Sequence, residues 1–234
     1  MATTTAFMRK TKRINLQTVT QYLYVFILLV AIAVVIFVVF QPITVLPRIA
    51  LSPGFALIDQ SGAQLTNEDL RGHVVLYNFT YTNCDGDCAD TTTYMAAVQA
   101  EVAKMNTGDI PVDLVTISVD PNDTPDILQA YAQSVNADPA VWHFLTGTES
   151  RIRWVVGGGF STYYKVLDNG AFKLAPSFML VDGAGILRAE YRSHVPAFDI
   201  VIRDIGLLVD EAQNKDGPSK YAYEAAHLFL CYPR

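Results

Sequence analysis

The feature that most limits what this chain can fold into is an apolar run from Tyr22 to Phe40, which reads YLYVFILLVAIAVVIFVVF. Its nineteen residues carry no charge. At about 1.5 Å per residue, a helix of this length spans the roughly 30 Å hydrocarbon core of a bilayer. A cleaved signal peptide would have an apolar core of about 7–15 residues and a small-x-small cleavage site, whereas this sequence continues as QPITVLPRIALSPG. We therefore expect an uncleaved transmembrane helix at residues 22–40.

Basic residues set the predicted orientation of this helix. Those that precede it are Arg9, Lys10, Lys12 and Arg13, with no acidic residue among them. Basic flanks stay cytoplasmic, so residues 1–21 are predicted inside the cell. Everything after Phe40 is then on the extracytoplasmic, periplasmic side of a single-pass protein of the cell membrane. That part keeps 13 of the 17 basic residues against 23 acidic ones, a net charge of about −10. This balance disfavours nucleic acid and suits a cationic or metal-bearing partner.

Strand patterns follow a short proline-containing linker at residues 41–52. Apolar, β-rich segments bounded by turn residues predict buried strands. They lie at Val74–Thr80, Val112–Val119 and Trp142–Gly147, and residues 177–192 read as a hairpin with a Gly183-Ala184-Gly185 turn.

Helical patterns alternate with these strands. The first follows Cys88 and would be capped by Asp90 or Thr91, and the second has Thr124 as N-cap and Pro125 at its first position. A short helix then ends at three glycines in residues 148–160, and a last amphipathic helix covers residues 196–213. The order predicts one α/β domain at residues 53–213, a mostly parallel sheet covered by helices on both faces.

The C-terminal tail, residues 214–234, follows the predicted end of this domain. It is rich in aromatic residues and holds the odd cysteine of three, Cys231. The tail is interpreted either as a short helix packed back on the domain, with Cys231 as a small buried side chain, or as a docking segment for a partner. Both interpretations stay open at this point.

The other two cysteines lie in the stretch TYTNCDGDCADT, between the predicted strand Val74–Thr80 and the helix that follows it. Cys84 and Cys88 are spaced so that both sulfurs can lie on one side of a first helical turn. Free backbone N–H groups and the positive helix end favour thiolates at such a corner. Outside the cytoplasm a disulfide can also persist. The pair is therefore a candidate metal clamp, a candidate redox couple, or an inert disulfide, although so short a loop gains little stability from closure.

Three segments together resemble the Sco/SenC family. They are PGFALIDQSGAQLTNEDLRGHVVLYNFTYTNCDGDC, VTISVDPNDTPDILQAYA and WHFLTGT, and the resemblance covers roughly residues 53–205 together with the single anchor. This family consists of membrane-anchored, thioredoxin-fold copper proteins that help to assemble the dinuclear copper site of cytochrome oxidase. The resemblance implies a thioredoxin-like fold, with Cys84 and Cys88 as metal ligands and as a redox pair.

The sequence departs from the family at positions that matter for copper. The family usually has proline after its first cysteine and often after its second, where this chain has Asp85 and Ala89. The family's third ligand is a histidine, and the matching position here is near Leu174. Cu(I) tolerates two thiolates, whereas Cu(II) prefers additional nitrogen ligands. We therefore expect copper as Cu(I) in preference to Cu(II), or a degenerate site that binds none.

The four histidines of the chain do not obviously replace this ligand. They are His73 at the far end of the central strand, His143 within a strand, His194 after the hairpin and His227 in the tail. His194 is the best substitute among them, and none is assigned. Pro176, in the segment APSFMLVD, resembles the proline that faces the active-site cysteines of thioredoxin-type oxidoreductases, where it is cis. A cis Pro176 would favour disulfide exchange, whereas the acidic Asp85 and Asp87 disfavour thiolates.

Three functions follow from these expectations. The preferred one is a Sco/SenC-like copper-binding or thiol-redox factor in the assembly or maintenance of a respiratory oxidase. The second is a Sco-like accessory subunit of a membrane respiratory electron-transfer complex, with a degenerate copper site. The third is a membrane-tethered thiol-disulfide oxidoreductase, the only one of the three in which the chain is an enzyme. The expected partners are the membrane and subunits of a respiratory oxidase or another respiratory complex.

Overall fold

The computed structural model describes residues 16–40, 43–84, 87–168, 170–192 and 195–229 of the 234-residue chain. The first helix, α1 (Leu16–Phe40), contains the predicted apolar run. Among the described residues, it is the one helix long and apolar enough to cross a membrane, over residues 19–39. Length and composition therefore agree with the span expected at residues 22–40.

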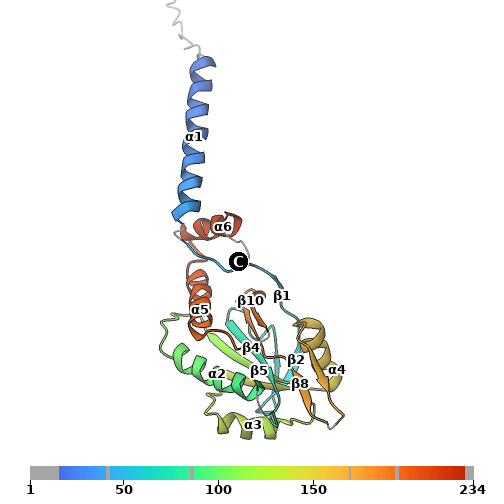
Figure 1. Ribbon diagram of the computed structural model, residues 1–234. Coiled ribbons are helices and arrows are strands. Elements are labelled where there is room, and N and C mark those ends of the chain that lie inside the picture. The colour runs from blue at the N-terminus through green and yellow to red at the C-terminus, as the bar shows by residue number, and fades with distance from the viewer. Residues whose placement is uncertain (1–15, 41–42, 85–86, 169, 193–194, 230–234) are drawn as a thin grey trace, which may run out of the picture. The chain divides into compact units, whose positions relative to one another are not determined.

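The domain that follows is built on one eight-stranded sheet (Figure 1). Its strands are β1 (Ala50–Leu51), β2 (Ala56–Asp59), β3 (Gln64–Thr66), β4 (Val74–Thr80), β5 (Val112–Ser118), β6 (Trp142–Thr146), β9 (Ser177–Val181) and β10 (Ile186–Arg192). Their order in the sheet is β1-β10-β9-β4-β5-β6-β2-β3. The three central strands β4, β5 and β6 run parallel, and the other pairings are antiparallel. The predicted α/β fold is confirmed, with a mixed sheet whose centre is parallel.

The central strands are buried on both sides, as continuous apolar runs predict. Every residue of β4 and of β5 is buried. Successive side chains alternate between two hydrophobic clusters: Val75, Tyr77 and Phe79 point to one, while Val74 and Leu76 point to the other. The sheet therefore separates two cores.

The helices cover these two faces. They are α2 (Asp87–Val102), α3 (Pro125–Ser134), α4 (Glu149–Ile152), α5 (Phe198–Gln213) and α6 (Ser219–Phe229), with a π-helical segment η1 (Arg153–Gly159) after α4. Apolar residues of α2, α3 and α5 fill one core, whereas α4 and η1 contribute Ile152, Val155 and Val156 to the other. Helices on both faces of the sheet were predicted from the alternation of elements.

One local prediction about the helices is wrong. The structure begins α2 at Asp87, so Asp90 and Thr91 lie inside its first turns rather than at its N-cap. The predicted short helix that ends at three glycines is observed, because α4 continues into η1 and η1 ends at Gly159, the third of them. Packing explains the glycine at position 159, since a Cβ there would lie 2.4 Å from Cβ of Pro53. For α3, Thr124 as N-cap residue and Pro125 at the first position are as predicted, although the Thr124 side chain makes no capping hydrogen bond.

A small hairpin of β7 (Tyr164–Val166) and β8 (Phe172–Leu174) was not predicted. It forms its own two-stranded sheet between η1 and β9 in the sequence. Strand β1, within residues 41–52, pairs with β10 at the sheet edge. The hairpin contains Leu174, near which the family resemblance places the third copper ligand.

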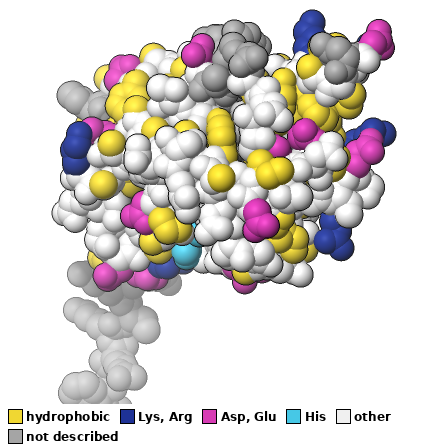
Figure 2. Space-filling view, turned by 90° about the horizontal axis from the view of Figure 1, so that it is seen from below, with side chains coloured by type: hydrophobic (Ala, Val, Ile, Leu, Met, Phe, Trp, Pro, Cys, Tyr) yellow, Lys and Arg dark blue, Asp and Glu magenta, His cyan; other side chains and the backbone are white. Residues whose placement is uncertain are grey.

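The face of the domain near α3 is mostly polar (Figure 2). Hydrophobic side chains occur there in separate patches, and acidic side chains are spread across the view. This distribution agrees with the acidic balance of the sequence.

Candidate functional site

The corner between β4 and α2 holds the first cysteine. After Thr80 ends the buried strand, the chain makes a turn in which the N–H of Cys84 donates to the carbonyl of Tyr81 at 3.2 Å. Helix α2 begins three residues later, at Asp87, so Cys88 lies in its first turn. The structure therefore places both predicted site residues at a sheet-to-helix corner, as the sequence indicated. The side chain of Cys88 lies outside the described part of the chain.

A buried polar chain fixes α2 on the sheet. The indole N–H of Trp142 donates to the hydroxyl of Thr116 at 2.7 Å, and that hydroxyl donates to Oδ1 of Asn78 at 2.6 Å. The amide of Asn78 in turn donates to Thr91 of α2 at 3.4 Å. All four residues are buried. Because buried polar groups that are fully hydrogen-bonded rigidify their surroundings, this chain orients the helix that carries Cys88.

Asp123 holds the turn before Cys84 in place. Its carboxylate accepts hydrogen bonds from the N–H of Thr82 at 2.9 Å and from the hydroxyls of Thr82 and Ser118. The carboxylate is buried, with 2% of the residue exposed. Asp123 follows β5 and lies forty-one residues from Thr82 in the sequence. No pattern in the sequence points to this residue beyond its place in the DPNDTP segment that supports the family resemblance.

Cys84 itself is disulfide-bonded and half-buried. The chain has two other cysteines, Cys88 and Cys231, and the side chains of both lie outside the described residues. A bridged sulfur is one of the three states that the sequence left open for this pair.

The residues against which Cys84 packs are apolar. Cys84 packs against the hydrophobic cluster that includes Tyr81 and, from the β7–β8 hairpin, Phe172 and Leu174. The rings of Tyr81 and Phe172 are 5.2 Å apart, and the Tyr81 hydroxyl donates to the carbonyl of Phe172 at 3.3 Å. The hairpin is therefore fastened to the cysteine turn, and the side chain of its Leu174 is buried.

The described residues offer no replacement nitrogen ligand. His73 pairs with Asp113 where β4 and β5 begin, at the ends of these strands away from Cys84, and His143 is a half-buried residue of β6. His227 pairs with Glu211 at 2.9 Å, and His194 lies outside the described residues. Within the described part, no three histidine, cysteine or acidic side chains are grouped so that they could hold a metal.

The peptide bond before Pro176 is trans, because none of the described peptide bonds is cis. The condition under which Pro176 would favour disulfide exchange is therefore not met, and this part of the sequence interpretation is corrected. Pro176 instead directly precedes β9, a position that strands tolerate.

The chain is similar in sequence to a known protein family. The sequence model of the SCO1/SenC family matches residues 45–206, which is more than half of the chain. The chain belongs to the SCO1/SenC family. The match contains the cysteine turn, Asp123 and the β7–β8 hairpin, and it ends within α5, before α6.

Relatives in sequence and structure agree with this assignment. The chain is 35% identical over 156 residues to the SCO1 protein homolog of Bacillus subtilis (strain 168), covering 64% of this chain and 79% of that protein. The structure of BsSco, a member of the Sco family of cytochrome c oxidase assembly proteins in which a disulfide switch was identified, superposes with a TM-score of 0.63 at 28% identity. That alignment covers 71% of this chain and 98% of BsSco. Bradyrhizobium japonicum ScoI with copper bound superposes with a TM-score of 0.57 at 26% identity, over 68% of this chain and 99% of that one.

Proposed function

We propose that this protein is a membrane-anchored assembly factor of a respiratory oxidase that works through the pair Cys84 and Cys88. In this proposal the pair alternates between a disulfide and a dithiol that binds Cu(I) as cargo. The observation that carries it is the disulfide-bonded Cys84 at the β4–α2 corner, in a domain whose relatives include an oxidase assembly protein and a copper-bound protein.

The donor set fits Cu(I) better than Cu(II). The family resemblance places the histidine ligand near Leu174, and Leu174 is buried in the cluster against which Cys84 packs. Two thiolates suffice for Cu(I), whereas Cu(II) prefers nitrogen donors in addition. Reduction of the bridge must precede copper binding. A dithiol reductant supplies the two electrons and two protons that convert the bridge into two thiols, and these thiols release their protons to water when they bind Cu(I).

We place the domain on the extracytoplasmic side of the cell membrane, with α1 as a single-pass anchor. The basic residues before α1 support this orientation, and the acidic domain suits a cationic cargo. An extracytoplasmic location also agrees with a cysteine pair that can remain oxidised until a reductant reaches it.

The test is an anaerobic Cu(I) titration of the full-length, reduced chain in mild detergent against a chromogenic Cu(I) chelator. We expect about one Cu(I) per chain, lost in Cys84→Ser and in Cys88→Ser. Cys231→Ser is the matched control and should bind as the wild type does. A reduced wild-type chain that binds no Cu(I), or a pair of serine variants that still bind it, refutes the copper proposal.

A second candidate is a membrane-tethered thiol-disulfide oxidoreductase, favoured by the bridged Cys84 together with the apolar Leu174. One thiolate of the reduced pair attacks the disulfide of a partner protein, forms a mixed disulfide and releases one partner thiolate. The second thiolate then attacks the mixed disulfide, so the partner gains two electrons and this chain is oxidised. A reversible potential in glutathione buffers, with electron transfer to a dithiol substrate but no Cu(I) binding, would select this candidate.

A third candidate is an accessory subunit of a membrane respiratory complex. Helix α6, beyond the family match, favours it as an added feature. Solubilisation of native membranes in mild detergent should then recover this chain in constant proportion to the complex. Its loss from the complex under those conditions speaks against a subunit role.

A further inference from the structure

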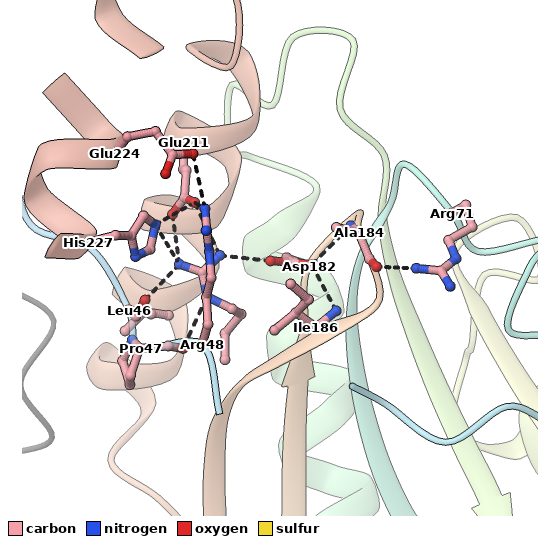
Figure 3. Close-up of polar contacts among 11 residues, drawn as sticks. Leu46, Pro47, Arg48, Arg71, Asp182, Ala184, Ile186, Glu211, Glu224 and His227 are labelled. Carbon is pink, nitrogen blue, oxygen red and sulfur yellow. Dashed lines mark hydrogen bonds and ion pairs between the residues drawn. The ribbon is translucent and has the colours of Figure 1, made fainter. Parts of the chain in front are cut away.

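Helix α6 lies outside the residues that match the family, and a buried ionic cluster holds it on the domain (Figure 3). The centre of this cluster is Arg188 of β10, whose side chain is 1% exposed. Its guanidinium donates to Asp182 at 2.8 Å and to Glu211 of α5 at 2.8 Å. It also donates to the carbonyls of Leu46 at 2.7 Å and Pro47 at 3.1 Å. A single side chain thus joins the start of the domain to α5.

The tail attaches to the same cluster. His227 of α6 lies 2.9 Å from Glu211 and 3.5 Å from Arg188, and Arg48 reaches Glu224 of α6 at 3.5 Å (Figure 3). Ala226 is fully buried. These contacts fix the rotation of α6 about its own axis.

The side of α6 away from the buried Ala226 presents two apolar side chains to the outside, with the half-exposed Glu224 between them. Tyr221 is 77% exposed and Leu228 is 78% exposed. They are seven residues apart, which puts them on one side of the helix. Lys220 beside them is exposed too. Two large apolar side chains therefore face outward on the side of α6 that the domain does not cover.

The short segment between the apolar run and the domain limits how far α6 can lie from the end of that run. The apolar run ends at Phe40, and the carbonyl of Leu46 already contacts Arg188. Six residues of extended chain span at most about 20 Å. Because Arg188 also contacts His227, the same short stretch of chain tethers α6 to the end of the apolar run.

We propose that the outward face of α6 rests on the lipid headgroup region of the membrane that α1 crosses. Leu228 would bury its side chain among the upper acyl chains, and Tyr221 would lie at the headgroups, where aromatic residues with a polar end are enriched. Lys220 can extend its charge toward lipid phosphates. This inference rests on α1 being an uncleaved anchor and is independent of the chemistry of Cys84.

The test uses the full-length chain in vesicles of phosphatidylcholine and phosphatidylglycerol, with or without bromine on the phosphatidylcholine acyl chains. Bromine quenches tryptophan within the bilayer, and the wild-type emission of Trp142 and Trp154 is subtracted. We expect the added emission of Leu228→Trp to fall about twofold or more in brominated vesicles, as for a side chain at the acyl boundary. Tyr221→Trp should fall as well. Both residues are exposed, so these changes leave the core intact.

Ile127→Trp is the matched control, because Ile127 is 44% exposed on α3, at the end of the domain away from α6 (Figure 1). Its emission should not change with bromination. Flotation of the chain with vesicles checks the anchor separately. A chain that floats but shows no quenching at Leu228→Trp overturns the proposal while leaving the anchor intact. A chain that does not float removes its premise. Protection of Leu228→Trp from aqueous iodide in native membranes only would indicate a protein partner and overturn the proposal.

Discussion

Replacing Glu211 with glutamine should lower the free energy of unfolding of the domain by about 3 kcal/mol at neutral pH. Burial acts to raise the pKa of Glu211, but hydrogen bonds from His227 and Arg188 and the charge of Arg188 outweigh it, and the pKa falls from 4.5 to about 2. The carboxylate is 17% exposed, so solvent screens the pairing only in part. Glutamine keeps the shape and removes the charge.

The magnitude follows from linkage between protonation and folding. The interval from pKa 4.5 in the unfolded chain to about 2 in the folded one is worth about 3 kcal/mol, at ~1.4 kcal/mol for each pH unit. Since the folded-state value is the lower one, this stabilisation is fully present above pH 4.5. It is lost as the pH falls from 4.5 toward 2.

The assay is denaturant unfolding of wild type and Glu211→Gln at several pH values, followed by the emission of the buried Trp142. Glu224→Gln is the control, because Glu224 also pairs with Arg48 but its side chain is 55% exposed. An exposed pair of this kind contributes less than ~1 kcal/mol. If Glu211→Gln costs no more than Glu224→Gln, or if the difference from wild type persists unchanged at pH 2–3, the reasoning about the Arg188 cluster is refuted.

Two further variants probe the thiol site. Asp123→Ala leaves the N–H and hydroxyl of Thr82 without their acceptor, so we expect a loss of about 2–4 kcal/mol in unfolding free energy and faster reduction of the Cys84 disulfide by dithiothreitol. The exposed Asp126→Ala on α3 should leave both measurements unchanged, and equal reduction rates in the two variants would contradict a role for Asp123 in holding the turn. Leu174→His should give the reduced protein a Cu(II) affinity at least about tenfold above that of wild type, read by absorption and electron paramagnetic resonance. Val166→His, exposed in the same hairpin, is the control, and a similar gain there would rule out a ligand position at residue 174.

The larger part of the fold could be predicted because its signals are local. A continuous apolar run identified Val74–Thr80 as a buried strand, and Thr124 followed by Pro125 marked the start of α3. The hairpin of β7 and β8 escaped prediction, since its strands of three residues are too short to show a period. The start of α2 at Asp87 was missed for a related reason. Asp87, where the helix begins, follows Cys84 so closely that it reads as part of the cysteine loop.

The site itself was predicted only in part. Cys84 and Cys88 could be placed at the strand-to-helix corner because they lie between the strand pattern at Val74–Thr80 and the helical pattern that follows. Asp123 was missed because its hydrogen bonds join residues forty-one positions apart, and a carboxylate in a polar loop resembles any solvated one. The burial of Leu174 near Cys84 depends on the hairpin, whose Phe172 ring packs on the ring of Tyr81.

The sequence by itself determined what depends on near neighbours: an apolar helix at residues 22–40, an α/β order of elements, and a cysteine pair at the end of a central strand. Tertiary structure alone decided which distant groups meet. Arg188 is the clearest case, since it is the extra residue of a β-bulge between Leu187 and Ala189. The bulge interrupts the alternation of strand side chains, so no pattern could place Arg188 inside. Its charge is tolerated there because Asp182, Glu211 and the carbonyls of Leu46 and Pro47, from three separate parts of the chain, converge on it.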